Sequence, residues 1–159
     1  MKILVTICGR TGSKGIKNKN IRSFLGHPLA SYTLSAAEQF KDRSEHEVDI
    51  CITSDSERLL KLGESFQDIK LVQRRAELAE DRTPKMLVLK DALSQQKETT
   101  GKNYDYLIDL DITSPLRKVS DVENALNTSI EKKVDVVLSA VNSRRNPYFN
   151  MVERNEEGI

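Results

Sequence analysis

The sequence contains few of the residues that build metal centres, disulfide frameworks and nucleophilic triads. Its 159 residues include two cysteines and two histidines, too few and too widely spaced for a zinc site. Cys8 and Cys51 both lie in apolar segments, which predicts reduced core residues and no disulfide. His27 and His46 have no partner at ligand spacing, and no Ser, His and Asp combination indicates a nucleophilic triad.

Long apolar runs and a strong net charge are also lacking. No stretch approaches the roughly 20 apolar residues of a membrane-spanning helix. Met1-Lys2 leads directly into a short apolar run and not into a signal-peptide core, so we expect a cytoplasmic protein that does not bind membranes. The net charge of +1 gives no overall attraction to nucleic acid, and any anion site must therefore be local.

The length and patterning predict one domain, residues 1–159, with 38% apolar residues to form a core. Strands are expected near residues 2–8, 48–53, 69–73, 105–111 and 134–141. Amphipathic helices are expected between them. Their starts include Leu29, Asp55, an N-cap at Thr83 followed by Pro84, and a capping box from Ser120 to Glu123. This alternation predicts an α/β fold, a mainly parallel sheet in a three-layer α/β/α sandwich.

A glycine-studded basic loop, residues 7–20, follows the first expected strand. A Walker loop would place its lysine directly after the second glycine, whereas Lys14 precedes Gly15. A dinucleotide fingerprint would need a glycine where Arg10 stands. Both patterns fail. What remains is an arginine-led loop at the carboxyl end of a strand, which can offer N–H groups and positive charge to a polyphosphate.

Five blocks of the sequence resemble, in order, motifs of the acylneuraminate cytidylyltransferase family, which activates sialic acids and related nonulosonic acids as CMP-sugars. The blocks are Gly9 to Gly15 with Lys19-Asn20 and Gly26-His27-Pro28-Leu29, then Thr53-Ser54-Asp55, Arg74 to Asp81, Thr113-Ser114-Pro115-Leu116-Arg117 and Asn146 to Val152. The chain departs from the family pattern at Arg75, where the family usually has proline. Because the blocks span nearly the whole chain, the resemblance is specific.

The resemblance implies a Rossmann-like nucleotidyltransferase that transfers CMP from CTP to the anomeric hydroxyl of a sialic acid or related nonulosonic acid and releases pyrophosphate. It also implies Mg²⁺ as cofactor, CTP and an acidic nine-carbon sugar as ligands, and a homodimer when full length. Family members continue beyond this length with a dimerisation element and metal-binding acidic residues. We therefore expect a C-terminal portion to be missing.

The same resemblance indicates which residues hold the nucleotide. Transfer of a cytidylyl group needs charge neutralisation on the phosphates and on the leaving pyrophosphate, and Arg10 and Lys19 are the expected catalytic residues. The expected nucleotide-binding residues are Gly9, Arg10, Gly12, Ser13, Lys19, Asn20, Arg74, Thr83 and Lys85. Simpler roles remain open: the loop lysines could face water, Arg74 could pair with Glu77 on the surface, and Thr83 and Lys85 could merely start a helix.

Two carboxylates, Asp109 and Asp111, close the fourth expected strand, and alternation places them on one side of it. Asp111 stands where better-known family members carry glutamine, at a position that contacts the acceptor sugar. A carboxylate there could bind magnesium or a sugar hydroxyl or amide, but it would repel a sugar carboxylate unless a metal or arginine intervenes. The expected substrate-binding residues are Asp111, Thr113, Ser114 and Arg117, with Asp111 also the expected metal ligand. Asp109 is expected to be structural.

Two alternative functions remain. Within enzymes, the chain could be a 3-deoxy-manno-octulosonate cytidylyltransferase or another nucleotide-sugar pyrophosphorylase, although the block from Thr113 to Arg117 argues against it. In another class, it could be a module that binds a nucleotide without catalysis. The sequence does not identify the sugar, because these acids share one reacting centre and differ in their substituents.

Overall fold

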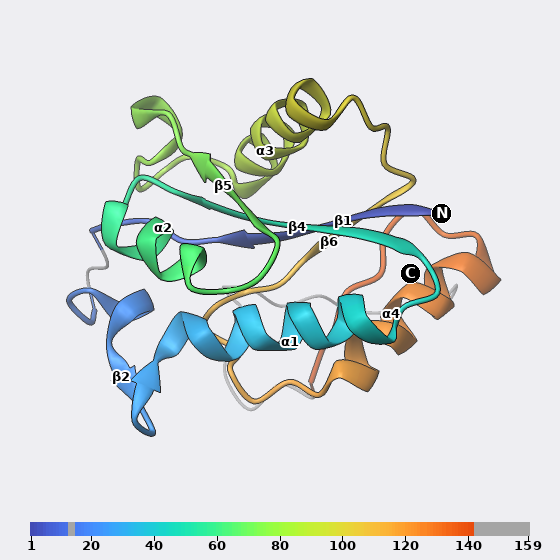
Figure 1. The fold of residues 1–159 in the computed structure, drawn as a ribbon, viewed down its shortest axis with the longest axis horizontal. Coiled ribbons are helices and arrows are strands. Elements are labelled where there is room, and N and C mark those ends of the chain that lie inside the picture. Colours follow the sequence, from blue (N-terminus) through green and yellow to red (C-terminus); the bar gives the residue numbers. More distant parts are fainter. Residues whose placement is uncertain (13–14, 142–159) are drawn as a thin grey trace. The chain divides into compact units, whose positions relative to one another are not determined.

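The computed structural model describes residues 1–12 and 15–141 (Figure 1). They divide into a compact unit, Met1–Asn124, and a second unit that begins at Ala125. Ser13 of the expected nucleotide site and the block from Asn146 to Val152 lie outside the described residues.

Four parallel strands form the main sheet in the order β5-β4-β1-β6. They are β1 (Lys2–Cys8), β4 (Glu47–Ser54), β5 (Ile69–Gln73) and β6 (Tyr106–Asp109). These four expected strands are confirmed. β6 is shorter than predicted because the chain turns at Asp111, whose side-chain oxygen accepts a hydrogen bond from the N–H of Thr113 at 2.7 Å.

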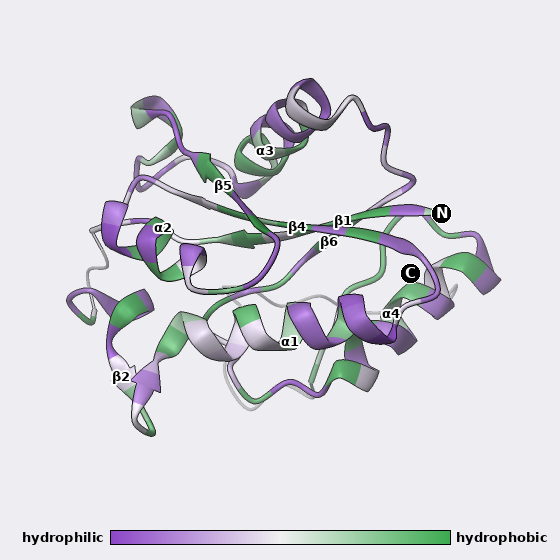
Figure 2. Ribbon diagram, in the orientation of Figure 1, coloured by the Kyte–Doolittle hydropathy of each residue, from purple (hydrophilic) through white to green (hydrophobic). Residues whose placement is uncertain are grey.

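Helices cover both faces of this sheet, which confirms the three-layer arrangement for the first unit (Figure 1). Helices α1 (Leu29–Arg43) and α2 (Glu57–Glu64) pack on one face, and α3 (Lys85–Thr100) packs on the other. In Figure 2 these helices show alternating hydrophobic and hydrophilic bands, as expected for helices that bury one side. Phe40 of α1 and Val88 of α3 are buried in this way.

The strand β1 lies at the centre of the core. Ile3, Leu4, Val5 and Ile7 are completely buried, and Val5 lies between Ile50 of β4 and Ile108 of β6. A strand covered on both faces and paired on both edges requires an almost continuous apolar sequence, which this segment has. Both cysteines are free thiols, as predicted, with Cys51 buried and Cys8 half-buried.

Short elements connect the main ones. A 3₁₀ helix, η1 (Lys19–Ile21), precedes an antiparallel hairpin of β2 (Ser23–Phe24) and β3 (His27–Pro28). The hairpin turns through Leu25 and Gly26, with φ angles of 47° and 90°. A second 3₁₀ helix, η2 (Ala76–Leu78), follows β5. None of these was expected, because each is too short to show a periodic apolar pattern.

Two predicted helix starts need correction. Pro84, and not Thr83, is the N-cap of α3. The hydroxyl of Thr83 instead donates to the carbonyl of Glu77 at 3.2 Å. Helix α4 (Val119–Lys132) begins one residue before the predicted capping box, and Asp121 accepts the N–H of Lys118 at 2.9 Å. The carboxylate half of the predicted capping box is present, but it joins Asp121 to Lys118, two residues before the predicted pair of Glu123 and Ser120.

The predicted strand over residues 134–141 is wrong. Helix α4 ends at Lys132, and the described residues that follow belong to no strand. Val136, Leu138 and Val141 are exposed by 70%, 73% and 93%. Alternating apolar residues favour a strand only where a neighbouring strand accepts the hydrogen bonds, and the pairing of the described sheet stops at β6. None of the described helices has both the length and the apolar character needed to cross a bilayer.

Candidate functional site

An open cavity of about 470 Å³ lies where β1 and β6 end. The sheet reverses its order at β1, with β4 on one side and β6 on the other, and open α/β sheets bind ligands at such a point. Ten residues line the cavity: Cys8, Gly9, Arg10, Gly15, Ile16, Lys19, Asn20, Asp111, Ile112 and Thr113. It therefore brings together six residues that the sequence predicted for the site: Gly9, Arg10, Lys19, Asn20, Asp111 and Thr113.

Gly9 allows the loop to leave β1 tightly against α2. Its N–H donates to the carbonyl of Thr53 at 3.1 Å. A Cβ atom added at Gly9 would lie 2.1 Å from Cδ2 of Leu59 and 3.1 Å from the side-chain nitrogen of Asn20. A larger residue here would force the buried side chain of Leu59 to shift, so the space at this position favours glycine.

The loop is held on two sides after Gly9. Asn20 donates its side-chain N–H to the carbonyl of Arg10 at 3.2 Å. Asp55, directly after β4, accepts the N–H of Thr11 at 2.8 Å and also the Thr11 hydroxyl. Gly12 follows with φ of 75°, a left-handed conformation that glycine adopts without strain. The backbone from Gly9 to Gly12 is thus shaped by partners from two other segments.

Arg10 and Lys19 are the cationic side chains among the described residues that line the cavity. The guanidinium of Arg10 forms an ion pair with Asp81 at 2.6 Å, with side chains 35% and 40% exposed. Exposed pairs of this kind contribute little stability, so an incoming phosphate can compete for the arginine. The residue therefore suits reversible anion binding.

Arg74, also expected at the nucleotide, is buried and lies outside the cavity lining. It donates from Nη2 to the carbonyl of Thr53 at 2.9 Å, and its Nε has no acceptor among the described residues. Burial lowers its pKa from the usual value. The alternative of a surface pair with Glu77 is excluded by this burial. Contact between Arg74 and a nucleotide stays a prediction.

Lys85, the first residue of α3, forms an ion pair with Asp109. Its ammonium lies 3.9 Å from the carboxylate of Asp111 as well. Although burial favours the neutral amine, the two carboxylates raise the pKa of Lys85 above its usual value. Burial and the charge of Asp109 also raise the pKa of the Cys8 thiol to about 12. Cys8 thus lines the cavity as a neutral thiol, whereas Lys85 is not among the lining residues, and its contact with a nucleotide stays a prediction.

Asp111 presents its carboxylate at the cavity rim. One oxygen accepts both the N–H and the hydroxyl of Thr113 at 2.7 Å. Burial would raise its pKa, but these hydrogen bonds and nearby lysines lower it below the usual value. No group of three or more metal-ligating side chains occurs among residues 1–12 and 15–141. Mg²⁺ commonly uses one or two carboxylates together with substrate phosphates, and Asp111 fits that donor set while Asp109 is paired with Lys85.

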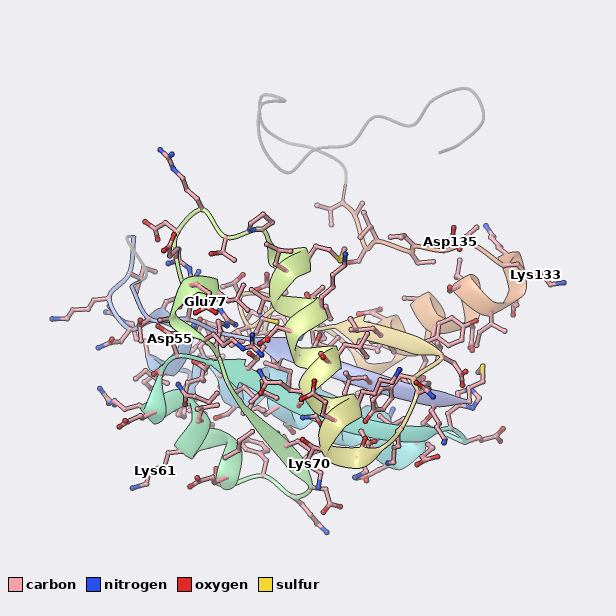
Figure 3. All side chains as sticks on the ribbon, turned by 90° about the horizontal axis from the view of Figure 1, so that it is seen from above. Asp55, Lys61, Lys70, Glu77, Lys133 and Asp135 are labelled. Carbon is pink, nitrogen blue, oxygen red and sulfur yellow. The ribbon has the colours of Figure 1, made fainter. Side chains whose placement is uncertain are left out.

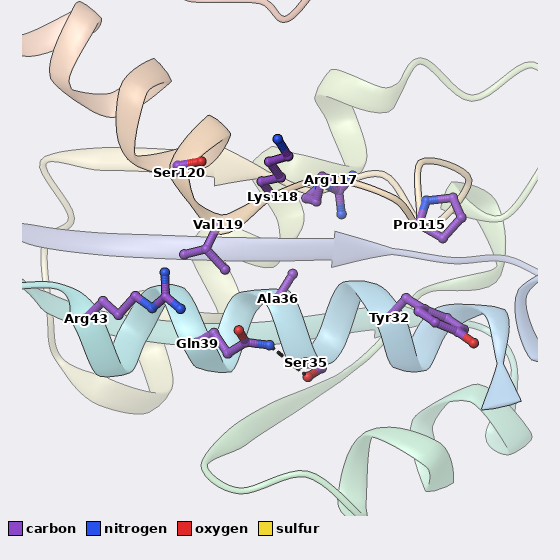
Figure 4. A pocket seen from close by; sticks show the side chains of 10 residues that line it. All are labelled: Tyr32, Ser35, Ala36, Gln39, Arg43, Pro115, Arg117, Lys118, Val119 and Ser120. Carbon is purple, nitrogen blue, oxygen red and sulfur yellow. Dashed lines mark hydrogen bonds between the residues drawn. The ribbon is translucent and has the colours of Figure 1, made fainter. Parts of the chain in front are cut away.

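Arg117 and Ser114 do not line the cavity. Arg117 donates to the hydroxyl of Thr33 at 3.2 Å and to the carbonyl of Asp111 at 2.7 Å. It lines a second cavity of about 400 Å³ between α1 and the start of α4, with Arg43 and Lys118 (Figure 4). In this arrangement Arg117 supports the turn that carries Asp111. Its contact with a substrate, and that of Ser114, stay predictions.

Asp55 and Asp81 were missed as contributors to the site. Asp55 belongs to the block Thr53-Ser54-Asp55, and a carboxylate directly after the strand beside β1 was the available signal. Figure 3 shows Asp55 and Glu77 at the end of the molecule where the parallel strands finish. Asp81 could not have been found from spacing, because its pairing with Arg10 joins two loops.

Comparison with known proteins adds independent findings. A family model described as Cytidylyltransferase matches residues 4–156. Post-translational flagellin modification protein B of Campylobacter coli is 40% identical over 96% of this chain and 63% of its own length. CMP-N,N'-diacetyllegionaminic acid synthase of Campylobacter jejuni is 39% identical over the same shares. N-acylneuraminate cytidylyltransferase of Streptococcus agalactiae is 31% identical over 92% of this chain and 34% of that protein. The chain thus spans less than two thirds of these curated relatives.

Among solved structures, CMP:2-keto-3-deoxy-manno-octonic acid synthetase complexed with CTP superposes with a TM-score of 0.62. The match covers 84% of this chain and 49% of that one at 15% sequence identity. Similarity at this level concerns the fold alone, and it agrees with the parallel sheet and helix layers described above.

Proposed function

The chain belongs to the cytidylyltransferase family that includes the CMP-nonulosonic acid synthetases, and we propose that its protein transfers CMP from CTP to the anomeric hydroxyl of a sialic acid or related nonulosonic acid. Pyrophosphate is the second product. The observation that carries the proposal is the cavity at the end of β1, where Arg10, Lys19 and Asn20 face Asp111 across an open space.

In this proposal the loop binds the triphosphate. Arg10 exchanges its exposed partner Asp81 for phosphate oxygens, and Lys19 adds a second positive charge from the cavity wall. The sugar hydroxyl attacks the α-phosphorus, the bond to the bridging oxygen of the β-phosphate breaks, and the leaving pyrophosphate is stabilised by these cations. The hydroxyl proton passes to solvent or to a base that we leave unassigned. Such catalysis depends on positioning and electrostatics.

The acceptor sugar is proposed to bind on the Asp111 side of the cavity. Thr113 fixes the carboxylate of Asp111, and Lys85 supplies a positive charge 3.9 Å from it. This ammonium offsets the repulsion between Asp111 and an acidic sugar that the sequence alone left unexplained. Arg74, Thr83 and Ser114 are kept in the proposal as residues for the nucleotide or sugar, on the family resemblance only.

Magnesium, a homodimer and a cytoplasmic location complete the proposal; the first two rest on the family resemblance, and the third on the sequence pattern after Met1. Asp111 is the residue that would hold Mg²⁺ together with phosphate oxygens. When bound, the ion would withdraw negative charge from those oxygens. The relative named CMP-N,N'-diacetyllegionaminic acid synthase, at 39% identity, supports a nonulosonic acid as the acceptor.

The direct test supplies the protein with CTP, magnesium and a panel of acids that includes N-acetylneuraminate, a diacetyllegionaminate and 3-deoxy-manno-octulosonate. Release of pyrophosphate with a nine-carbon acid is the expected result. Arg10→Ala should lower turnover at least about a hundredfold, whereas Lys17→Ala, an exposed lysine of the same loop outside the cavity lining, should be nearly neutral. Binding of CTP without turnover for any sugar would favour the nucleotide-binding module instead.

A further inference from the structure

We infer that Asp55 is a positioning residue that fixes the conformation of the phosphate-binding loop through Thr11. The conformational part of this inference stands on hydrogen bonds alone. Its consequence for CTP rests on the function proposed above.

The carboxylate of Asp55 holds one loop residue with both oxygens. Oδ1 accepts the backbone N–H of Thr11 at 2.8 Å, and Oδ2 accepts the hydroxyl of the same residue. Two bonds to one residue fix both its backbone direction and its side-chain rotamer. Thr11 lies between Arg10, which faces the cavity, and Gly12, which turns the chain at a φ of 75°. The bonds therefore constrain the path of the backbone between Arg10 and Gly12, just after β1 ends.

Asp55 is itself well anchored. The carbonyls of Thr53 and Ser54, just before it, accept the N–H groups of Gly9 at 3.1 Å and Arg74 at 2.9 Å. On its other side, the N–H of Ser56 donates to the hydroxyl of Ser54 at 2.9 Å. The carboxylate is thus placed by the end of a central strand, and the loop takes its shape from that strand.

The negative charge of Asp55 should oppose the binding of an anion. This allows a role through charge alone to be distinguished from a role in positioning the loop. A carboxylate near a triphosphate weakens binding by repulsion. If Asp55 contributed only charge, Asp55→Asn would tighten CTP binding. If it positions the loop, the same change weakens binding, because both charge-assisted bonds are lost: the amide oxygen accepts one N–H as a neutral acceptor, and the amide nitrogen can meet the Thr11 hydroxyl only as a donor. The sign of the effect therefore decides between the roles.

The first experiment follows backbone amides by NMR without any ligand. Burial raises the pKa of Asp55, but the bonds from Thr11 outweigh this and hold it below the usual value. The amide proton of Thr11 should therefore shift on acidification with a midpoint below that of an ordinary aspartate. In Asp55→Asn the shift should vanish, and the amide signals of Arg10 and Gly12 should move. A Thr11 amide that does not sense this titration overturns the inference.

The second experiment measures CTP affinity by calorimetry and, where turnover is found, kcat and KM. Loss of the charge-assisted bonds should weaken CTP binding roughly tenfold or more in Asp55→Asn. Thr11→Ser keeps both donors and should retain affinity, whereas Thr11→Val should lose part of it. Asp68→Asn removes an exposed ion pair with Lys41 elsewhere and serves as the matched control.

The two experiments distinguish a failure of the positioning role from a failure of the proposed function. Tighter or unchanged CTP binding in Asp55→Asn, with the Thr11 amide still in its original position, refutes the positioning role. If the protein turns over no sugar, the NMR titration and the CTP affinity still test the positioning role of Asp55. If CTP does not bind at all, the proposed function fails, and the Thr11 amide alone tests whether Asp55 fixes the loop.

Discussion

Replacing Gly9 by alanine tests whether the root of the loop is as tightly packed as the structure indicates. The new Cβ would lie 2.1 Å from Cδ2 of Leu59, a side chain that is 1% exposed and would have to repack within the core. It would also crowd the side-chain nitrogen of Asn20 at 3.1 Å, the group that holds the carbonyl of Arg10. The substitution should therefore lower the stability of the protein and disturb the bond from Asn20 that holds the loop.

The magnitude follows from two opposing effects. Forcing an extra carbon into a packed site costs about 1–3 kcal/mol, and so short a contact with a buried side chain belongs at the upper end. The change from glycine to alanine also restricts the unfolded chain, which returns about 0.4–1 kcal/mol. The net loss is about 2 kcal/mol, or a fall in Tm of roughly 4–8 °C for a chain of this size.

Urea and thermal unfolding measure this difference, with Gly15→Ala as the control. Gly15 lies in the same loop, and an added Cβ there meets no atom within 4 Å, so that variant should match the parent or exceed it slightly. A second control is Gly9→Ala combined with Leu59→Val, which removes the clashing atom. The loss of unfolding free energy in this double variant should be smaller than the sum of the losses in the two single variants. Equal stability of Gly9→Ala and Gly15→Ala would refute the reasoning.

Three further predictions concern other parts of the first unit. Ser56→Ala removes the oxygen that caps the N–H of Leu59 at 3.3 Å and should destabilise α2 by about 1 kcal/mol, measured by urea unfolding. Cys8, with its pKa raised to about 12, should resist iodoacetamide at pH 8 until the protein unfolds, and rapid labelling of the folded protein would contradict this. Burial alone would raise the pKa of Asp49, but hydrogen bonds from Lys102 and Tyr104 outweigh it and hold this pKa below its usual value. The ionised carboxylate should therefore stabilise the folded protein at pH values above the pKa of Asp49 in the unfolded chain. This stabilisation should be lost as the pH falls through the pKa of Asp49 in the folded protein. Asp49→Asn should therefore flatten the acid limb of the stability profile, and an unchanged limb would be evidence against the pairing.

Much of the fold could be predicted because its strands are strongly patterned. β1 begins and ends where the sequence indicated, since a buried parallel strand requires an apolar run bounded by polar residues. The bounds of the edge strand β5 were also predicted correctly, although it buries only Ile69 and Val72. The segment 134–141 has a similar pattern yet forms no strand. Patterning reports what a segment could bury, whereas strand formation also requires a partner, and pairing is not encoded locally.

The candidate site was predictable in part for a related reason. Residues within one loop or one turn, such as Gly9 and Asp111, were found because a short motif and a strand end place them. The pairings of Arg10 with Asp81 and of Lys85 with Asp109 join distant segments, so no spacing reveals them. Arg74 is the opposite case. Its motif predicted contact with a ligand, whereas in the structure its side chain is buried and donates to the carbonyl of Thr53.

The central position of β1 also has a consequence for motion. Since β1 pairs with β4 along its length and with β6 from Ile3 to Thr6, the amides in these ladders can exchange with solvent only when the sheet itself opens. Thr11, three residues beyond the end of β1, is held by two bonds to the side chain of Asp55, and breaking these bonds alone frees its amide. Hydrogen exchange should therefore be slow up to the end of β1 and faster at Thr11, so that the boundary between opening of the whole sheet and local opening falls within a few residues of Gly9.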